Sequence, residues 1–374
     1  MAAIRIKPNE STYLEISSSS LCTMSLGASD TVIPALAVNW TFLRDAFVNV
    51  DLVAIAKECL NDPSLIVEYY KSTDAFVVAA ELMTMLTVFH CAMGEITRNY
   101  SQVDKAWSIL PAVYAWHFTL HDYLNRSFFH PRLLLGSILI TLWGMRLTYN
   151  FARKGGYEWH GRDYRFVYIH EFLGQVGMSI FNMIFIGPFQ DTLLLLMVTP
   201  LYLNTHMQDT TLNKMDLVAA ILFLVFLFIE GIADDQQFMF QTKKYALLEF
   251  VDNDKKRLSG DYKKGFLCSS GLWQYSRHPN FFAEISLWWC VYLFSVAANL
   301  QQVDYDSLMN TDVWINWTIP GAVILTMLFQ GSTWLTEYIS SEKYPEYLEY
   351  RKNVNRFIPW FPNRPIVDSS KKDL

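Results

Sequence analysis

The apolar stretch 215–233 of this 374-residue chain limits its fold more than any other feature. It reads MDLVAAILFLVFLFIEGIA and stays apolar until Glu230. A helix needs about 20 mostly apolar residues to cross the hydrocarbon core of a bilayer. Other segments have the same character, and open sheet edges are not tolerated in lipid. The sequence therefore predicts an all-α, polytopic membrane helix bundle of about seven transmembrane helices. The other expected spans are 75–97, 108–122, 133–150, 172–203, 281–299 and 314–334.

Two of these segments are ambiguous. The segment 75–97 is among the weakest candidates because it contains ionisable side chains, including Glu81 and Glu95. The segment 172–203 is too long for one straight crossing and is interrupted at Gly187–Pro188. It is either one crossing with a re-entrant or interfacial part, or two short spans.

The placement of basic residues predicts the orientation of the bundle. Lys and Arg are frequent in 151–165, in 241–280 and after 334, whereas 300–313 contains neither. Cytosolic loops of membrane proteins carry an excess of Lys and Arg. These three regions are therefore expected in the cytosol, which requires 172–203 to cross an odd number of times, most simply once. The C-terminus is then cytosolic and the N-terminus lies on the other side.

The last four residues suggest a location. Lys371 and Lys372 occupy the fourth and third positions from the end. Two lysines there resemble a dilysine retrieval signal of the endoplasmic reticulum, although a solvated lysine-rich tail is an equally simple reading. A cytosolic C-terminus favours the retrieval signal.

Composition excludes several other classes of protein. Hydrophobic residues make up 52% of the chain and charged residues only 18%, whereas soluble domains carry about 25% charge. The net charge of −6 gives no basic footprint for nucleic acid. The five cysteines include no Cys-x-x-Cys pair, so we expect neither a disulfide framework nor a metal site. We expect residues 1–72 to be an N-terminal extension with one amphipathic helix at most. Residues 73–374 would form the membrane domain, and nothing indicates the oligomeric state.

The turn before the span 281–299 is the strongest candidate site. Pro279 suits the first position of a helix, so a helix N-terminus with unpaired N–H groups would lie at the cytosolic rim of the membrane. Arg277 directly before it has a guanidinium suited to phosphate. Asn280 and Glu284 share one helical face, and an ionisable side chain such as Glu284 inside a span is a functional candidate. The alternative is an interfacial Arg-His-Pro turn with a Glu that reaches the membrane surface.

A second polar group ends the span 215–233. Glu230 and Asp234 lie four residues apart and Gln236 follows. They could be only the polar end of the helix, but they face the same cytosolic side as Arg277. Asp104 either caps a helix or faces a cavity, and the sequence leaves this open. The basic loop 161–165 is most simply a solvated cytosolic loop.

These residues resemble a known family. The run Gly-Leu-Trp-x-Tyr-Ser-Arg-His-Pro-Asn-Phe-x-x-Glu at 271–284 is similar to the C-terminal motif of steroid 5α-reductase-like membrane proteins, and weaker similarity extends over 99–360. The resemblance implies a seven-helix bundle that binds NADPH in its cytosolic half, about 215–360. It implies reduction of a carbon–carbon double bond conjugated to a carbonyl in a lipid or steroid-like molecule. The early acid and tyrosine with which steroid-reducing members hold the ketone are not matched here, so the substrate is open.

The motif and the resemblance give nine candidate site residues. The catalytic candidates are Glu284 and Tyr275. The cofactor-binding candidates are Glu230, Asp234, Gln236, Trp273, Arg277, His278 and Asn280.

Two other functions remain open from the sequence. Membrane methyltransferases that use S-adenosylmethionine also have an Arg-His-Pro turn before a final hairpin, although they have Gly-Pro-Tyr where this chain has Gly271-Leu272-Trp273. A non-catalytic lipid-binding protein with the same fold is the third possibility.

Overall fold

The computed structural model describes residues 41, 62, 64–302 and 311–363. Within these ranges the chain is helical and contains no β-strand, which confirms the all-α prediction. Within the expected N-terminal extension, the described residues include one helix of nine residues, α3 (Ser64–Ser72). The rest of that extension and the dilysine tail lie outside the described residues.

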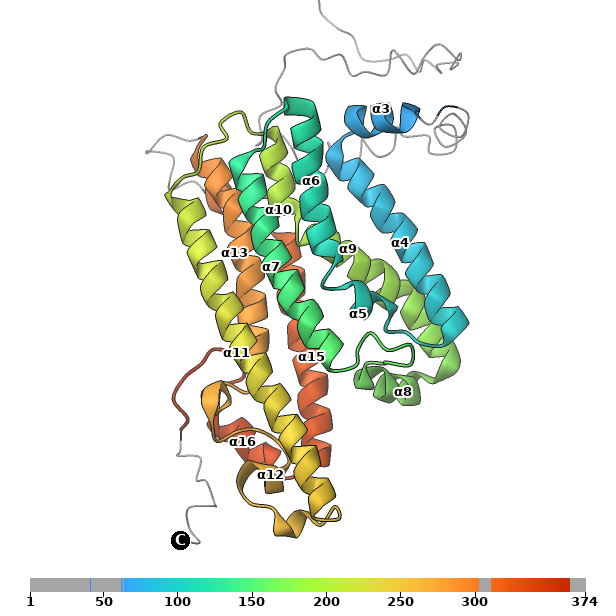
Figure 1. Ribbon diagram of the computed structural model, residues 1–374, viewed down its shortest axis with the longest axis vertical. Coiled ribbons are helices and arrows are strands. Elements are labelled where there is room, and N and C mark those ends of the chain that lie inside the picture. Colours follow the sequence, from blue (N-terminus) through green and yellow to red (C-terminus); the bar gives the residue numbers. More distant parts are fainter. Residues whose placement is uncertain (1–40, 42–61, 63, 303–310, 364–374) are drawn as a thin grey trace, which may run out of the picture. The chain divides into compact units, whose positions relative to one another are not determined.

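Every expected span coincides with a helix (Figure 1). Within the described ranges, four helices are long and apolar enough to cross a membrane: Ala75–Thr97, Tyr164–His206, Lys214–Phe250 and Pro279–Leu300. The segment 75–97 is thus one of the four, although its charged residues made it a weak candidate. The remaining expected spans correspond to α6 (Leu110–Arg126), α7 (Pro131–Arg153) and α15 (Pro320–Lys343).

The long helix Tyr164–His206 does not break at Gly187–Pro188. That pair lies in a π-helical turn, η3 (Asn182–Phe189), which continues directly from α8 (Tyr164–Phe181). A wider turn can accommodate a proline that lacks an N–H donor. The kink lies instead at Gly174, whose φ of 66° and ψ of 178° are accessible only to glycine. The helix then continues through α9 (Gln190–Leu196), α10 (Thr199–Tyr202) and η4 (Leu203–His206).

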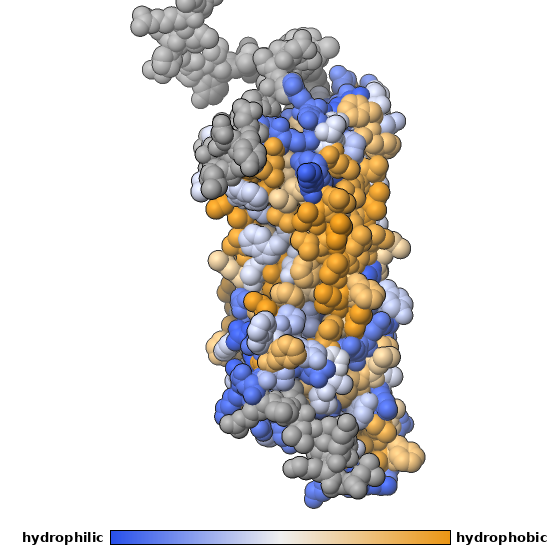
Figure 2. All heavy atoms as spheres, turned by 90° about the vertical axis from the view of Figure 1, so that its left-hand side faces the viewer, coloured by the Kyte–Doolittle hydropathy of each residue, from blue (hydrophilic) through white to orange (hydrophobic). Residues whose placement is uncertain are grey.

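The helices form one bundle in which successive helices run in opposite directions (Figure 1). In this bundle α11 (Lys214–Phe250) packs along α13 (Pro279–Leu300), α6 packs on α7, and α4 (Ala75–Thr97) packs on η3 and α9. Large side chains from several helices fill the interior without exposure, among them Trp143, Phe118 and Phe294. Figure 2 shows the face over α11, where hydrophobic side chains fill the middle and hydrophilic ones gather toward both ends. Exposed Leu217, Ile221 and Phe228 belong to this apolar face.

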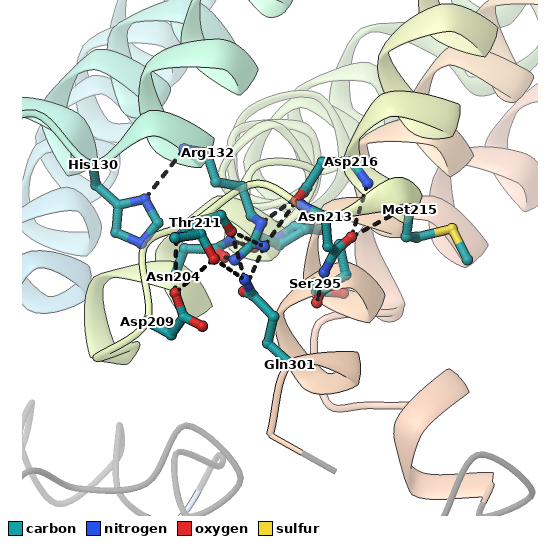
Figure 3. A network of polar contacts seen from close by, with 12 residues as sticks. His130, Arg132, Asn204, Asp209, Thr211, Asn213, Met215, Asp216, Ser295 and Gln301 are labelled. Atoms are coloured by element: carbon teal, nitrogen blue, oxygen red, sulfur yellow. Dashed lines mark hydrogen bonds and ion pairs between the residues drawn. The ribbon is translucent and has the colours of Figure 1, made fainter. Parts of the chain in front are cut away.

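At one end of the bundle a buried arginine joins three helices (Figure 3). Arg132, at the start of α7, is fully buried and donates to both carboxylate oxygens of Asp216 on α11, at 2.6 and 2.8 Å. It also donates to Gln301 at the end of α13 (2.6 Å). Asp216 in turn accepts from the backbone N–H of Asn213 (2.8 Å), which completes a capping box. This end is therefore held by a satisfied polar network.

The opposite end carries a small lobe built on the second half of α11. It comprises η5 (Lys255–Arg257), α12 (Gly260–Lys264), η6 (Gly271–Gln274) and α16 (Tyr347–Asn353). Phe266, Tyr347 and Tyr350 form its apolar core. The short helices α5 (Gln102–Ala106) and α14 (Thr311–Trp314) lie in connections between longer ones.

Candidate functional site

A cavity of about 460 Å³ opens between α5, α7, α8, α11, α13 and α15. Its wall is largely apolar, and its polar residues come from both halves of the chain. The apolar wall consists of Trp107, Leu147, Phe151, Phe166, Ile169, Phe181, Phe185, Phe281, Leu328, Phe329 and Leu335. The polar lining includes four of the candidates from the sequence: Glu230, Asp234, Asn280 and Glu284. This mixture of an apolar wall and a few polar groups is typical of small-molecule sites.

The four candidates gather around one arginine from α7. The Arg146 guanidinium lies 2.7 Å from a carboxylate oxygen of Glu230 and 2.6 Å from one of Asp234. Glu284 is 3.7 Å from the same guanidinium. The spacing of Glu230 and Asp234 places both on the face of α11 that meets α7. A single cation thus holds three carboxylates that would otherwise repel one another.

Glu284 is fixed by two further donors. Its carboxylate oxygens accept from the indole N–H groups of Trp143 (2.8 Å) and Trp288 (3.0 Å). Both oxygens are therefore occupied, and the side chain is buried. Such a carboxylate is a fixed acceptor that helps to position Arg146, rather than a free acid.

Several oxygens that line the cavity have no partner in the part of the chain that the structure describes. They belong to side chains on four different elements: Asp104 Oδ2, Gln190 Oε1, Glu230 Oε2 and Asn280 Oδ1. A buried polar atom without a hydrogen bond costs about 1–3 kcal/mol. These positions therefore favour a ligand that donates hydrogen bonds, or ordered water.

The mouth of the cavity carries charges of both signs. Arg165 donates to both carboxylate oxygens of Asp163 and also contacts Ser332. Asp104 lies close by, and burial together with the negative charge of Asp163 raises its pKa to about 6, despite the opposing effect of Arg165. Lys154 lines the mouth and is exposed. No side-chain partner of Lys154 is found among the described residues, so its ammonium group is free to meet an anion.

The structure places Arg277 and His278 away from this cavity. The Arg277 guanidinium pairs with Glu337 (2.6 Å) and donates to the backbone carbonyls of Arg351 (2.8 Å) and Val354 (2.5 Å). His278 Nε2 lies 3.1 Å from the same Glu337 carboxylate. Burial alone would raise the pKa of Glu337, but hydrogen bonds from His278 and Arg277 outweigh it and lower the pKa to about 2. Arg277 thus ties the C-terminal segment to the turn before α13, and its Nε and Nη1 donors are engaged within the protein.

The other three candidates also support the turn rather than line the cavity. Gln236 accepts from the backbone N–H of Leu272 (2.9 Å). The Trp273 indole donates to the Ala233 carbonyl (3.3 Å). Tyr275 packs edge-on against Phe361 with ring centroids 5.8 Å apart. The structure therefore brings four of the nine candidates into one cavity, while four others lie in the adjoining turn and Gln236 contacts that turn from α11.

Sequence reasoning missed the residues that α7 and α9 contribute. Arg146 and Asn150 lie four residues apart on α7, and Asn150 donates to Asp234 (2.8 Å). An arginine within an apolar segment was the signal that could have found this face. Gln190 carried no comparable signal. The open question about Asp104 is answered, since it lines the cavity.

Comparison with known proteins places the chain. Residues 90–356 match the family described as "Protein of unknown function (DUF1295)". This chain belongs to the DUF1295 family. An uncharacterized protein of Schizosaccharomyces pombe is 35% identical over 295 residues, which cover 78% of this chain and 82% of that protein. No solved structure matches the chain.

The part of the chain that matches DUF1295 contains every residue that lines the cavity, from Asp104 to Leu335. The cavity is therefore a property of the DUF1295 region and does not depend on the N-terminal extension. Among the described residues of this family member, no group of three His, Cys, Asp or Glu side chains is placed to hold a metal ion.

Proposed function

We propose that this DUF1295 protein is a membrane-embedded oxidoreductase. It would use NADPH to reduce a carbon–carbon double bond conjugated to a carbonyl in a lipid or steroid-like molecule. The observation that carries the proposal is the cavity, in which a buried carboxylate–arginine cluster faces an apolar wall between helices. The motif at 271–284 supports it, as does the inclusion of steroid 5α-reductase-like proteins in the DUF1295 family.

The residues of the cavity suit the cofactor. The unpartnered oxygens of Glu230 and Asn280 are acceptors for the carboxamide and ribose donors of a nicotinamide nucleotide. Asp234 would complete this set. Lys154 at the mouth, rather than Arg277, is the cation available to the diphosphate. NADPH would supply the hydride, and the protein would supply position and electrostatics.

The apolar wall suits a substrate that partitions into the bilayer. Addition of hydride to the β-carbon of an enone builds negative charge on the carbonyl oxygen, and a hydrogen-bond donor in a water-poor site lowers that barrier. Gln190 is a buried amide that lines the cavity, and its NH₂ group would serve as this donor. Asp104, with a pKa of about 6, is the lining carboxyl suited to pass the proton that the α-carbon requires.

The proposed topology has seven crossings and a cytosolic C-terminus. Successive helices run in opposite directions (Figure 1), and the loop after α7, the lobe on α11 and the segment after α15 lie at the same end of the bundle. These are the three regions rich in Lys and Arg. A cytosolic tail would allow the dilysine sequence to act in retrieval to the endoplasmic reticulum.

A second function has one observation in its favour. Five carboxylates line the cavity, from Asp104, Asp163, Glu230, Asp234 and Glu284, against two cations that line it, Lys154 and Arg165. This excess of negative charge would also suit the sulfonium and ammonium groups of S-adenosylmethionine. A membrane methyltransferase is therefore the alternative.

Thermal protection of the purified protein separates these functions. A ligand that binds only the folded state raises the unfolding temperature in proportion to the logarithm of its concentration over its Kd. Protection by NADPH supports the reductase, and protection by S-adenosylmethionine supports the methyltransferase. Protection by lipid alone supports a lipid-binding protein. NADPH oxidation with a panel of enone lipids then tests turnover.

A matched pair of variants tests the site itself. Lys154→Met should weaken NADPH binding by about tenfold or more, since it removes a charge-assisted contact. Lys352→Met removes an equal charge from an exposed position outside the cavity and should leave affinity unchanged. Equal affinities for the two variants would remove Lys154 from the cofactor site. No response of the wild-type protein to NADPH would refute the reductase.

A further inference from the structure

Three lysine ammonium groups meet over the ring of Tyr344 in the lobe on α11. The Nζ atoms of Lys244, Lys255 and Lys343 lie 5.9, 5.9 and 5.5 Å from the ring centroid. Lys244 comes from α11, Lys255 from η5 and Lys343 from the end of α15. Like charges from three separate elements thus lie around one aromatic ring.

Lys244 is buried within this cluster. Its side chain is 4% exposed, and its ammonium group donates to the backbone carbonyl of Gly265 (3.2 Å). Gly265 has a φ of 90°, and a Cβ atom there would lie 2.4 Å from the Tyr344 ring. The turn thus brings the backbone against Tyr344 and directs one carbonyl at Lys244. One neutral acceptor does not compensate a buried charge.

The cluster lacks a counter-ion among the described residues. No carboxylate in those ranges lies within ion-pair distance of any of the three ammonium groups. The other two buried cationic side chains of the described chain are both paired, Arg132 with Asp216 and Arg277 with Glu337, each at 2.6 Å. Lys244 is therefore the exception. Buried charges are normally paired, so this position is suited to an external anion.

We infer that Lys244, Lys255 and Lys343 form a binding site for a phosphate group. Lys255 and Lys343 are exposed, so an anion can reach the cluster from solvent, while Lys244 closes it from inside. Several ammonium donors that converge from different directions suit the three oxygens of a phosphate better than the two of a carboxylate. The site is separate from the cavity, because none of the three lysines lines it.

Two sources can supply this phosphate. Lys244 lies eleven residues beyond Ala233, where the apolar run of α11 ends, and this is about 16 Å along a helix. The polar layer of a bilayer adds only about 5–8 Å on each side of the hydrocarbon core. A soluble phosphate compound reaches the site readily, whereas a lipid needs a long phosphorylated head group.

The test compares two double variants with the same change in net charge. Lys255→Gln/Lys343→Gln removes the exposed part of the cluster. Lys256→Gln/Lys263→Gln removes two exposed lysines of the same lobe that do not contact Tyr344. Lys244→Met is the third variant, and its folding is checked by its unfolding temperature in chloride. Binding of inorganic phosphate is measured by calorimetry in detergent at constant ionic strength. In a second arm, phosphatidylcholine vesicles with and without phosphatidylinositol phosphate are used.

We expect the cluster variant to weaken phosphate binding by about tenfold or more relative to the control variant. Binding of inorganic phosphate in detergent assigns the site to a soluble compound, and binding only to the phosphorylated vesicles assigns it to a lipid head group. Either result supports the inference. Equal affinity of the cluster and control variants for both probes overturns it, as does absence of binding to either probe by the wild-type protein.

Discussion

Loss of the Arg146 side chain should destabilise the protein strongly. Loss of Arg153, which also lies on α7 and pairs with an acid of α11, should have a much smaller effect. Arg146 is the shared partner of Glu230 and Asp234, at 2.7 and 2.6 Å, and lies 3.7 Å from Glu284. Arg146→Met preserves much of the side-chain volume but leaves three buried carboxylates without a cation. Removing one partner of a buried ion pair costs about 3–5 kcal/mol. We expect a loss at the upper end of this range.

The same helix provides the control. Arg153 pairs with Asp235, which directly follows Asp234, but Asp235 is 61% exposed. An exposed pair contributes about 0.2–1 kcal/mol. Arg153→Met should therefore change stability little, although it makes the same chemical change about two helical turns further along α7.

Thermal unfolding in one detergent measures the difference. At about 2–4 °C per kcal/mol, Arg146→Met should lower the midpoint by roughly 10 °C or more, and Arg153→Met by no more than about 4 °C. The triple variant Arg146→Met/Glu230→Gln/Asp234→Asn should recover most of the loss, because it removes the uncompensated charges. Equal midpoints for the two single variants, or no recovery in the triple variant, would refute the electrostatic account of this cluster.

Three further predictions concern pH and topology. The pKa of Asp104 is about 6 in the folded protein against 3.8 ordinarily, so its contribution to stability is present below pH 4 and is lost as the pH rises through 6. Asp104→Asn should therefore stabilise the protein at pH 7.5 by about 1–2 kcal/mol. The measurement is a shift of the unfolding midpoint that disappears at pH 4. The pKa of Glu337 is about 2 in the folded protein against 4.5 ordinarily, so its contribution to stability is present above pH 4.5 and is lost as the pH falls toward 2. Glu337→Gln should lower the free energy of unfolding by about 2–3 kcal/mol at pH 7. It should also speed proteolysis of the segment after α15. For the topology, a membrane-impermeant maleimide should label Lys256→Cys from the cytosolic side and Asp209→Cys from the opposite side.

Each of these predictions has a distinct contrary result. A midpoint shift for Asp104→Asn that is the same at pH 4 and pH 7.5 would show that ionisation of Asp104 does not destabilise the folded protein. Unchanged proteolysis of Glu337→Gln would show that other contacts hold the C-terminal segment. Labelling of both cysteines from the same side would contradict the proposed crossing of α11, which separates the two positions.

The sequence was sufficient for the helices because their apolar character is a local property. Each expected span coincides with a helix, whereas the number of crossings made by 172–203 stays a prediction. The position of the kink was not predictable from Gly187–Pro188, because a π-helical turn absorbs the proline and Gly174 bends the chain instead.

The site was predictable only in part, because it depends on partners far away in sequence. Glu230 and Asn280 were recognisable as polar residues at membrane-facing helix ends. The role of Arg277 was not, because its guanidinium is occupied by Glu337, sixty residues later in the chain. An arginine next to a helix N-terminus has the same sequence pattern whether its guanidinium binds a phosphate or pairs with a carboxylate from another helix. Only the three-dimensional structure distinguishes these cases.

The arginine network in Figure 3 has a consequence for how the chain is made. Arg132 is synthesised with α7, but Asp216 and Gln301 follow 84 and 169 residues later. Until Asp216 is in place, the buried position of Arg132 lacks the carboxylate that neutralises it. The ends of α7, α11 and α13 can therefore lock together only after nearly the whole bundle has been synthesised.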